Sequence, residues 1–110
     1  MENTSLTALA REQLVLAQNA PSGRSSHTVY GGEGHTLRQT LIALVASRKL
    51  DEHQNPGEAT IYVLQGRVRL SAGDKSLDGA PGHQMIVPDA RHTLEALEDS
   101  VVLLTTVIPQ

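Results

Sequence analysis

Beyond residue 25, the sequence consists of short runs in which apolar residues recur at every second position. The clearest run is residues 59–64, where Ala59, Ile61 and Val63 alternate with other residues. Successive side chains of a β-strand point to opposite faces, so this spacing predicts strands. Glycine and proline punctuate the runs, for example at residues 73–74 and 79–82. Some eight short strands at near-even spacing are typical of a sandwich or barrel, and we expect an all-β domain.

The first twenty residues follow a different period. Across residues 5–19, apolar residues fall on one helical stripe, and Ser5 is a suitable N-cap. Pro21 ends the pattern, so we divide the chain into an N-terminal helical arm (1–21) and a β-barrel domain (22–110). The stripe is narrow, and we expect the helix to dock on a larger element. A single helix with one arginine does not make a helix-turn-helix.

Two segments are too apolar to stand at the surface. Residues 36–47 carry apolar side chains on both faces, Leu41 and Ala43 on one and Ile42 and Leu44 on the other. Such a strand is expected between the barrel interior and another layer, although a helix is the competing interpretation. Residues 100–108 form a second apolar strand, which must be paired inside the sheet or covered by a second subunit. We take this as an argument for a homodimer.

Composition excludes several functions. The net charge of −3 gives no basic surface for nucleic acid or an anionic membrane. Without cysteine there is no disulfide, thiolate nucleophile or cysteine-bound zinc. Arg11 and Glu12 interrupt the N-terminal apolar residues before a secretory signal can form, and no stretch approaches the roughly 20 apolar residues of a membrane span. We expect a soluble, cytoplasmic protein.

Two spaced motifs resemble those of the cupins, the jelly-roll or double-stranded β-helix family, in particular its single-domain conserved-barrel members. The first cupin motif reads H-x-H-x-x-x-E-x-x-x-x-x-x-G, and His53 and Gly66 match its ends. The second reads G-x-x-x-x-x-P-x-G-x-x-H. Gly82 and Pro88 match it in spacing, Ala90 replaces its glycine, and His92 comes one position early. The resemblance implies a cupin barrel that carries a short N-terminal helix.

The resemblance also implies a degenerate metal site at the barrel mouth. Cupins typically hold a divalent transition metal, such as Zn, Fe, Mn or Ni, with three histidines and a glutamate. Here His53 and His92 are the remaining ligand candidates, because Asn55 and Ala59 occupy two of the ligand positions. Glu58 has the opposite strand parity and is expected to point outward unless a β-bulge turns it. Two imidazoles and an amide are a poor set of ligands.

Other polar residues receive structural interpretations. His83 is expected at a strand end after a turn, and His27 and His35 are assigned no role. Arg67 and Arg69 share one face, where cross-strand partners are a better expectation than an anion site. The motif 31–34 is rich in glycine but lies between strands, so it predicts a loop rather than a phosphate site.

The preferred hypothesis is therefore a small cupin that binds a small molecule at its mouth. We expect His53, Asn55, Ala59, Ile61 and His92 to contact this ligand, with Val63, Ile86 and the strand 36–47 lining the interior behind them. No catalytic residue is assigned. One alternative is a metal-dependent cupin enzyme of dioxygenase, isomerase or decarboxylase type. Another is a ligand-sensing regulatory protein that acts on a partner protein through its helix.

Overall fold

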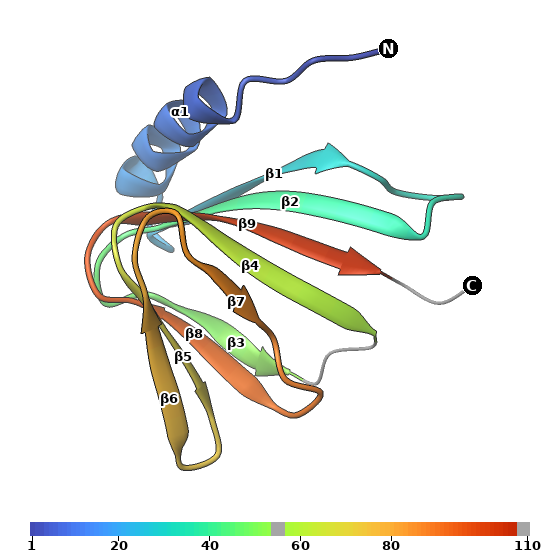
Figure 1. Cartoon of the computed structure of the whole chain (residues 1–110). Coiled ribbons are helices and arrows are strands. Elements are labelled where there is room, and N and C mark those ends of the chain that lie inside the picture. Colours follow the sequence, from blue (N-terminus) through green and yellow to red (C-terminus); the bar gives the residue numbers. More distant parts are fainter. Residues whose placement is uncertain (54–56, 108–110) are drawn as a thin grey trace.

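A computed structural model describes residues 1–53 and 57–107, without the side chains of residues 51–53. The described part contains one helix and nine strands (Figure 1). In chain order the elements are α1 (Leu6–Asn19), β1 (Arg24–Tyr30), β2 (Leu37–Leu44), β3 (Lys49–His53), β4 (Glu58–Gln65), β5 (Val68–Ala72), β6 (Lys75–Gly79), β7 (Gln84–Ile86), β8 (His92–Ala96) and β9 (Ser100–Val107).

The strands form two sheets, one above the other (Figure 1). The five-stranded sheet has the order β1-β2-β9-β4-β7, and the four-stranded sheet has the order β3-β8-β5-β6. Neighbouring strands in the described part pair antiparallel. We call the side of each sheet that faces the other sheet its inner face. The expected all-β jelly-roll is therefore confirmed.

Alternation along the strands builds the main core between the sheets. In β4, Ala59, Ile61 and Val63 are buried, as expected, and they pack with Val68 and Leu70 of β5. Each lies on an inner face because every second residue of a strand points the same way. Burial of these aliphatic side chains, at about 25 cal/mol for each Å² of apolar surface, holds the two sheets together.

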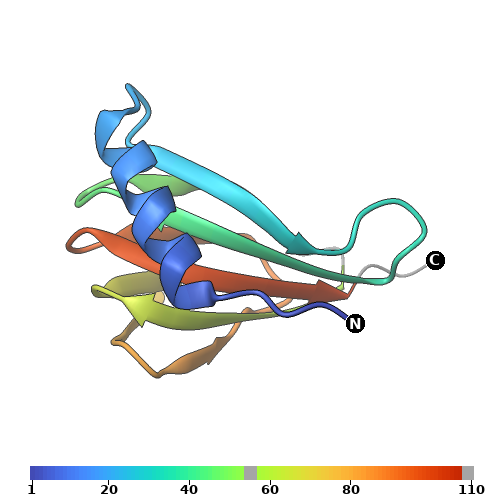
Figure 2. The ribbon, with the colours of Figure 1, turned by 90° about the horizontal axis from the view of Figure 1, so that it is seen from above.

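A second core lies under α1, on the outer face of the five-stranded sheet. Figure 2 shows the helix running across β1, β2 and β9. Ser5 caps the helix as expected, since its Oγ accepts a hydrogen bond from the backbone N–H of Ala8 at 3.1 Å. Ala10 and Ala17 are buried against the sheet. No helix in the described part is long and apolar enough to cross a membrane.

The two strongly apolar segments are both strands with two covered faces. In β2, Leu41 and Ala43 belong to the core under the helix, whereas Ile42 and Leu44 belong to the core between the sheets. The sandwiched position expected for residues 36–47 is confirmed, and the helical alternative is wrong. The strand β9 lies between β2 and β4 and pairs with both. Its edges are thus satisfied within the chain, without a second subunit.

Candidate functional site

The two histidines singled out by the sequence are brought together by strand pairing. The register of β3 and β8 places His53 directly opposite His92, after an irregularity that begins at Leu50. His92 is 7% exposed and shares its inner-face parity with the core residues Leu94 and Ala96. Asn55 lies outside the described residues. The backbone therefore unites positions 53 and 92, which are far apart in sequence, at one end of the sandwich.

Inner-face residues of the four-stranded sheet form rows across the strands. One row consists of leucines only: Leu50 pairs with Leu94, Leu94 with Leu70, and Leu70 with Leu77. The next row towards the strand ends changes character. Lys75 pairs with Ala72, and the register of β5 and β8, continued by one residue, sets Ala72 opposite His92. The apolar core thus ends at a row of small, basic and imidazole-bearing residues, which we call the mouth row.

The five-stranded sheet ends in the same way. Thr106 of β9 pairs with Arg38 of β2 on one side and with Ala59 of β4 on the other. These three residues share the inner-face parity of Ile42, Val102 and Ile61 in the core. Ala59 and Ile61, both expected at the ligand site, are buried on this inner face.

The ring of His92 has a defined tautomer. Its Nδ1 lies 2.9 Å from the carbonyl oxygen of Ala90. A carbonyl oxygen only accepts, so Nδ1 carries the donated proton and, in the neutral ring, Nε2 carries the lone pair. The loop that precedes β8 thereby orients the imidazole at the mouth.

The described donors do not fit a metal site. No group of three His, Cys, Asp or Glu residues able to hold a metal ion occurs among them. Glu58, the nearest carboxylate to the expected ligand position, pairs with Val107 and is exposed, as its parity predicted. Ala59 fills the inner position instead, and alanine offers no ligand atom. The metal assignment to His53 and His92 stays a prediction that these neighbours do not support.

The interior lining differs from expectation at one position. Ile86 was expected inside the barrel, but it is 68% exposed, and its partner across the ladder is Thr60. Met85 pairs with Ile61 and is buried in its place. The expectation for Ile86 is wrong because the register of the short edge strand β7 turns Met85 inward.

The largest of the described cavities, about 650 Å³, lies where the two sheets open between β6 and β7. Leu70 and Leu77 of the leucine row form one wall, and Ala72 and Lys75 of the mouth row border it. The cavity opens to the surface at the edge strand β7, where the exposed Ile86 lines it together with Asp74, Ser76 and Pro88. It therefore has an apolar wall and a polar rim beside the row that contains His92.

At the other open side of the sandwich, a cavity of about 400 Å³ separates β1 and β2 from β3. Thr40 and Ile42 line it from β2, and Leu50 lines it from β3. This shared lining shows that β2 of one sheet faces β3 of the other. The inner space is thus approachable from both sides.

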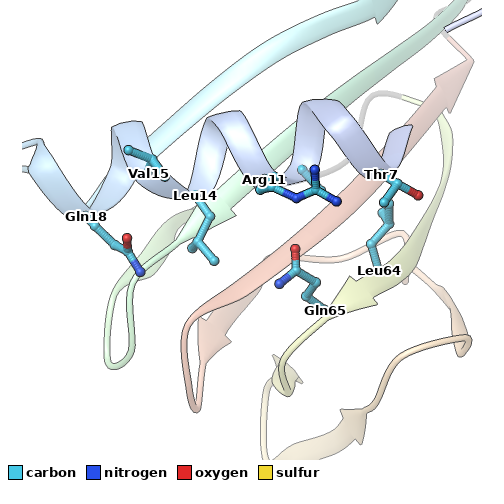
Figure 3. Close-up of a pocket in the computed structure, with 8 residues that line it drawn as sticks. Thr7, Arg11, Leu14, Val15, Gln18, Leu64 and Gln65 are labelled. Atoms are coloured by element: carbon cyan, nitrogen blue, oxygen red, sulfur yellow. The ribbon is translucent and has the colours of Figure 1, made fainter. Parts of the chain in front are cut away.

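A third hollow lies outside the sandwich. Figure 3 shows this groove between α1 and the end of β4, with Arg11, Leu14 and Gln18 on the helix side and Leu64 and Gln65 on the strand side. Its volume is about 360 Å³. Among the described side chains expected to contact the ligand, Ala59, Ile61 and His92 line neither this groove nor the other two cavities.

The structural interpretations of His83 and Arg69 agree with the contacts that these residues make. His83 accepts a hydrogen bond at Nδ1 from the backbone N–H of Ala80, at 3.0 Å, in the turn before β7. Arg69 donates to both carboxylate oxygens of Asp78 across β5 and β6, at 2.8 and 3.2 Å. Hydrogen bonding to Arg69 lowers the pKa of Asp78 below its usual value.

Arg38 and Lys75 were not among the residues expected at the mouth. Arg38 precedes Thr40 and Ile42 at the same two-residue spacing, so the alternation alone indicates that it lies on the inner face of β2. Nothing in the sequence relates Lys75 to His92, because only the pairing of β6, β5 and β8 puts them in one row.

The chain is similar in structure to several solved proteins, among them a protein of the cupin superfamily. A cupin superfamily protein from Desulfitobacterium hafniense matches with a TM-score of 0.71, at 18% identity, over 78% of each chain. A protein from Thermus thermophilus matches with a TM-score of 0.76, at 24% identity, over 99% of this chain and all of the other. A conserved protein of unknown function from Streptococcus pyogenes matches with a TM-score of 0.75, at 23% identity, over 100% of this chain and 92% of the other.

By sequence alone, the chain matches no family model and no curated protein. At identities of 24% or less, the similarity to these three structures establishes the fold. The site must therefore be argued from the residues of this chain.

Proposed function

We propose that this chain, which has the cupin fold, is a small-molecule-binding protein whose ligand occupies the mouth end of the space between the sheets. The cavity between β6 and β7 carries the proposal. Its volume of about 650 Å³ lies within the usual range for small-molecule sites, about 300–1,000 Å³. The leucine row supplies its apolar wall, and Ala72 and Lys75 of the mouth row line it, next to His92 in the same row.

At the mouth end of β4, the inner position carries no titratable side chain, which favours binding over turnover. The imidazole of His92 is held by the carbonyl oxygen of Ala90. In β4, the inner position at the mouth belongs to Ala59 and the carboxylate of Glu58 is exposed on the outer face. General acid–base catalysis needs titratable groups within hydrogen-bonding reach of the reacting atoms. A hydrophobic wall with a few polar groups at its edge is instead the usual form of a binding site.

A change in the apolar wall tests the proposal. Leu77 is 54% exposed and lines the cavity, so Leu77→Glu places a carboxylate beside the ligand without removing a core residue. Desolvating that charge opposes binding of an apolar molecule. The probe is N-phenyl-1-naphthylamine, a neutral fluorophore that brightens in apolar surroundings. We expect saturable binding to the wild-type protein, weakened at least about tenfold by Leu77→Glu.

The matched control is Leu16→Glu. Leu16 is 55% exposed on α1, far from the cavity lining. This variant should bind the fluorophore like the wild type. Amide chemical-shift changes should map to Leu70, Ala72 and Ile86 when the fluorophore binds. The proposal is wrong if the wild-type protein does not bind it, or if both variants bind it equally well.

A further inference from the structure

Charge is distributed unevenly between the two faces of the sheets. Among the described side chains, the strand positions on the inner faces that carry a charge are Arg24, Arg38 and Lys75, which share the parity of Leu44, Thr40 and Leu77. The acidic strand residues with described side chains lie on the outer faces. Glu58 pairs with Val107, and Asp78 and Glu95 both pair with Arg69. The charged inner-face strand positions whose side chains are described are therefore all basic, although the chain has a net charge of −3.

Arg38 occupies the most exposed inner position of β2, at the mouth. Its ladder partner on β9 is Thr106, which in turn pairs with Ala59. On the other side, Gly31 lets the loop after β1 approach closely, since a Cβ there would lie 2.9 Å from the Cα of Arg38. The backbone of Arg38 is therefore held from both sides, whereas its side chain is exposed.

The cavity lined by Thr40, Ile42 and Leu50 shows which strands oppose each other near Arg38, although Arg38 itself does not line it. Within it, β2 and β3 oppose each other across the space between the sheets. Arg38 lies two residues beyond Thr40 towards the mouth, and His53 lies three residues beyond Leu50 in the same direction, opposite His92. Packed sheets are about 10 Å apart. An arginine side chain from one sheet can therefore reach into the space above the paired positions 53 and 92.

From this arrangement we propose that the ligand carries a carboxylate and that Arg38 binds it. The inference rests on the proposed small-molecule site and specifies its ligand class. A guanidinium presents parallel N–H donors that match both oxygens of a carboxylate. The apolar part of the ligand lies against Leu77 and Ala72. The mouth row crosses β6, β5 and β8, which lie about 4.8 Å apart, and Arg38 belongs to β2 of the opposite sheet. In this proposal the ligand extends along the row past His92 towards Arg38.

The same arrangement argues against a divalent cation as the occupant. Arg38 and Lys75 carry positive charge on the two sheets that enclose the mouth, and these charges disfavour a metal cation between them. Lys75 is the competing anchor for a carboxylate, because it lines the cavity directly. It lies next to Asp74, however, which also lines the cavity and offsets its charge.

A pair of probes that differ in charge alone tests the proposal. Isothermal titration compares 4-phenylbutyrate with its neutral amide, 4-phenylbutyramide. We expect the wild-type protein to bind the carboxylate at least about tenfold more tightly than the amide, as hydrogen bonds to charged groups commonly give. Arg38→Gln should abolish this preference and leave the affinity for the amide unchanged. Raising the salt concentration should weaken binding of the carboxylate only.

Two variants complete the design. Arg67→Gln removes an exposed arginine that precedes β5. The backbone N–H of Arg67 donates to Oγ of Ser100, at the end of the sandwich away from the mouth row. This variant should keep the preference for the carboxylate. Lys75→Gln, which removes a charge from the cavity lining, should reduce the preference less than Arg38→Gln does. The inference is overturned if the wild type binds both probes equally, or if Lys75→Gln rather than Arg38→Gln removes the preference. If the inference fails in this way but the protein still binds the amide and N-phenyl-1-naphthylamine, the proposed function stands. If none of the three probes binds, both the inference and the proposed function are wrong.

Discussion

At the scale of single residues, Gly66 shows how one motif position acts structurally. It is the closing glycine of the first motif and has φ +80°. A Cβ at this position would lie 2.3 Å from both the carbonyl oxygen of Asp99 and Oγ of Ser100. Gly66 therefore permits both a left-handed backbone and a close approach between the turns that follow β4 and β8.

We expect Gly66→Ala to destabilise the protein by about 2–4 kcal/mol, because the left-handed conformation and the contact with backbone both oppose a side chain. Gly73→Ala is the matched control. Gly73 has φ +61°, but nothing lies within 4 Å of an added Cβ, so it should lose only about 1–2 kcal/mol. Urea unfolding of the two variants measures the difference. Equal losses would contradict the role given to the close approach.

At the scale of elements, one carboxylate ties the helix to two turns. Asp99, between β8 and β9, accepts a hydrogen bond from the backbone N–H of Ala46 at 2.9 Å and one from the side chain of Gln18 at 3.0 Å. The hydrogen bond from Ala46 is the main cause that lowers the pKa of Asp99, followed by the one from Gln18. The arm, which was expected to dock on a larger element, is thus joined to the barrel at its C-terminal end.

This pKa gives a prediction with a definite sign. The folded state favours the ionised carboxylate of Asp99. Its contribution to the stability of the fold is therefore complete above the usual pKa of an aspartate, about 3.9. That contribution is lost as the pH falls through the lower pKa that Asp99 has in the folded state. Asp99→Asn should cost about 1 kcal/mol at neutral pH. Thermal unfolding, followed from neutral pH down to about pH 2.5, should show a smaller loss of stability below about pH 4 in the variant than in the wild type. An unchanged pH profile would remove Asp99 from this role.

At the scale of the whole molecule, the homodimer expected from sequence stays a prediction, and its basis has changed. The strand β9 is paired on both edges within the chain. Beyond the area that α1 covers, however, the outer face of the five-stranded sheet exposes Tyr62 and Val107. The described strand residues of this region carry one charge, on Glu58, so two copies can approach with little repulsion.

Sedimentation equilibrium tests this surface. We expect the wild-type protein to form a dimer that Tyr62→Lys weakens at least about tenfold, since it buries a charge in the contact. Leu16→Lys, on the exposed side of α1, should leave the dimer unchanged. A monomeric wild-type protein, or equal effects of the two substitutions, would refute the prediction.

Much of the fold could be predicted because its signals are local. The alternation of residues 59–64 identified the inner face of β4, and the double apolar pattern of residues 36–47 identified a strand covered on both sides. Ile86 was assigned to the wrong face because three residues of β7 contain too few periods to define a face without the partner strand.

The candidate site was predictable only in part. The motif spacing identified residues 53 and 92, and the register of β3 and β8 sets them opposite each other. What the sequence by itself determined is the face on which each strand residue lies, since that follows from the two-residue period of the backbone. Tertiary structure alone decided which strands are neighbours. That pairing joins Lys75, Ala72 and His92 into one row, and the packing of the sheets sets β2 against β3, because contacts between distant segments depend on packing that no local pattern encodes.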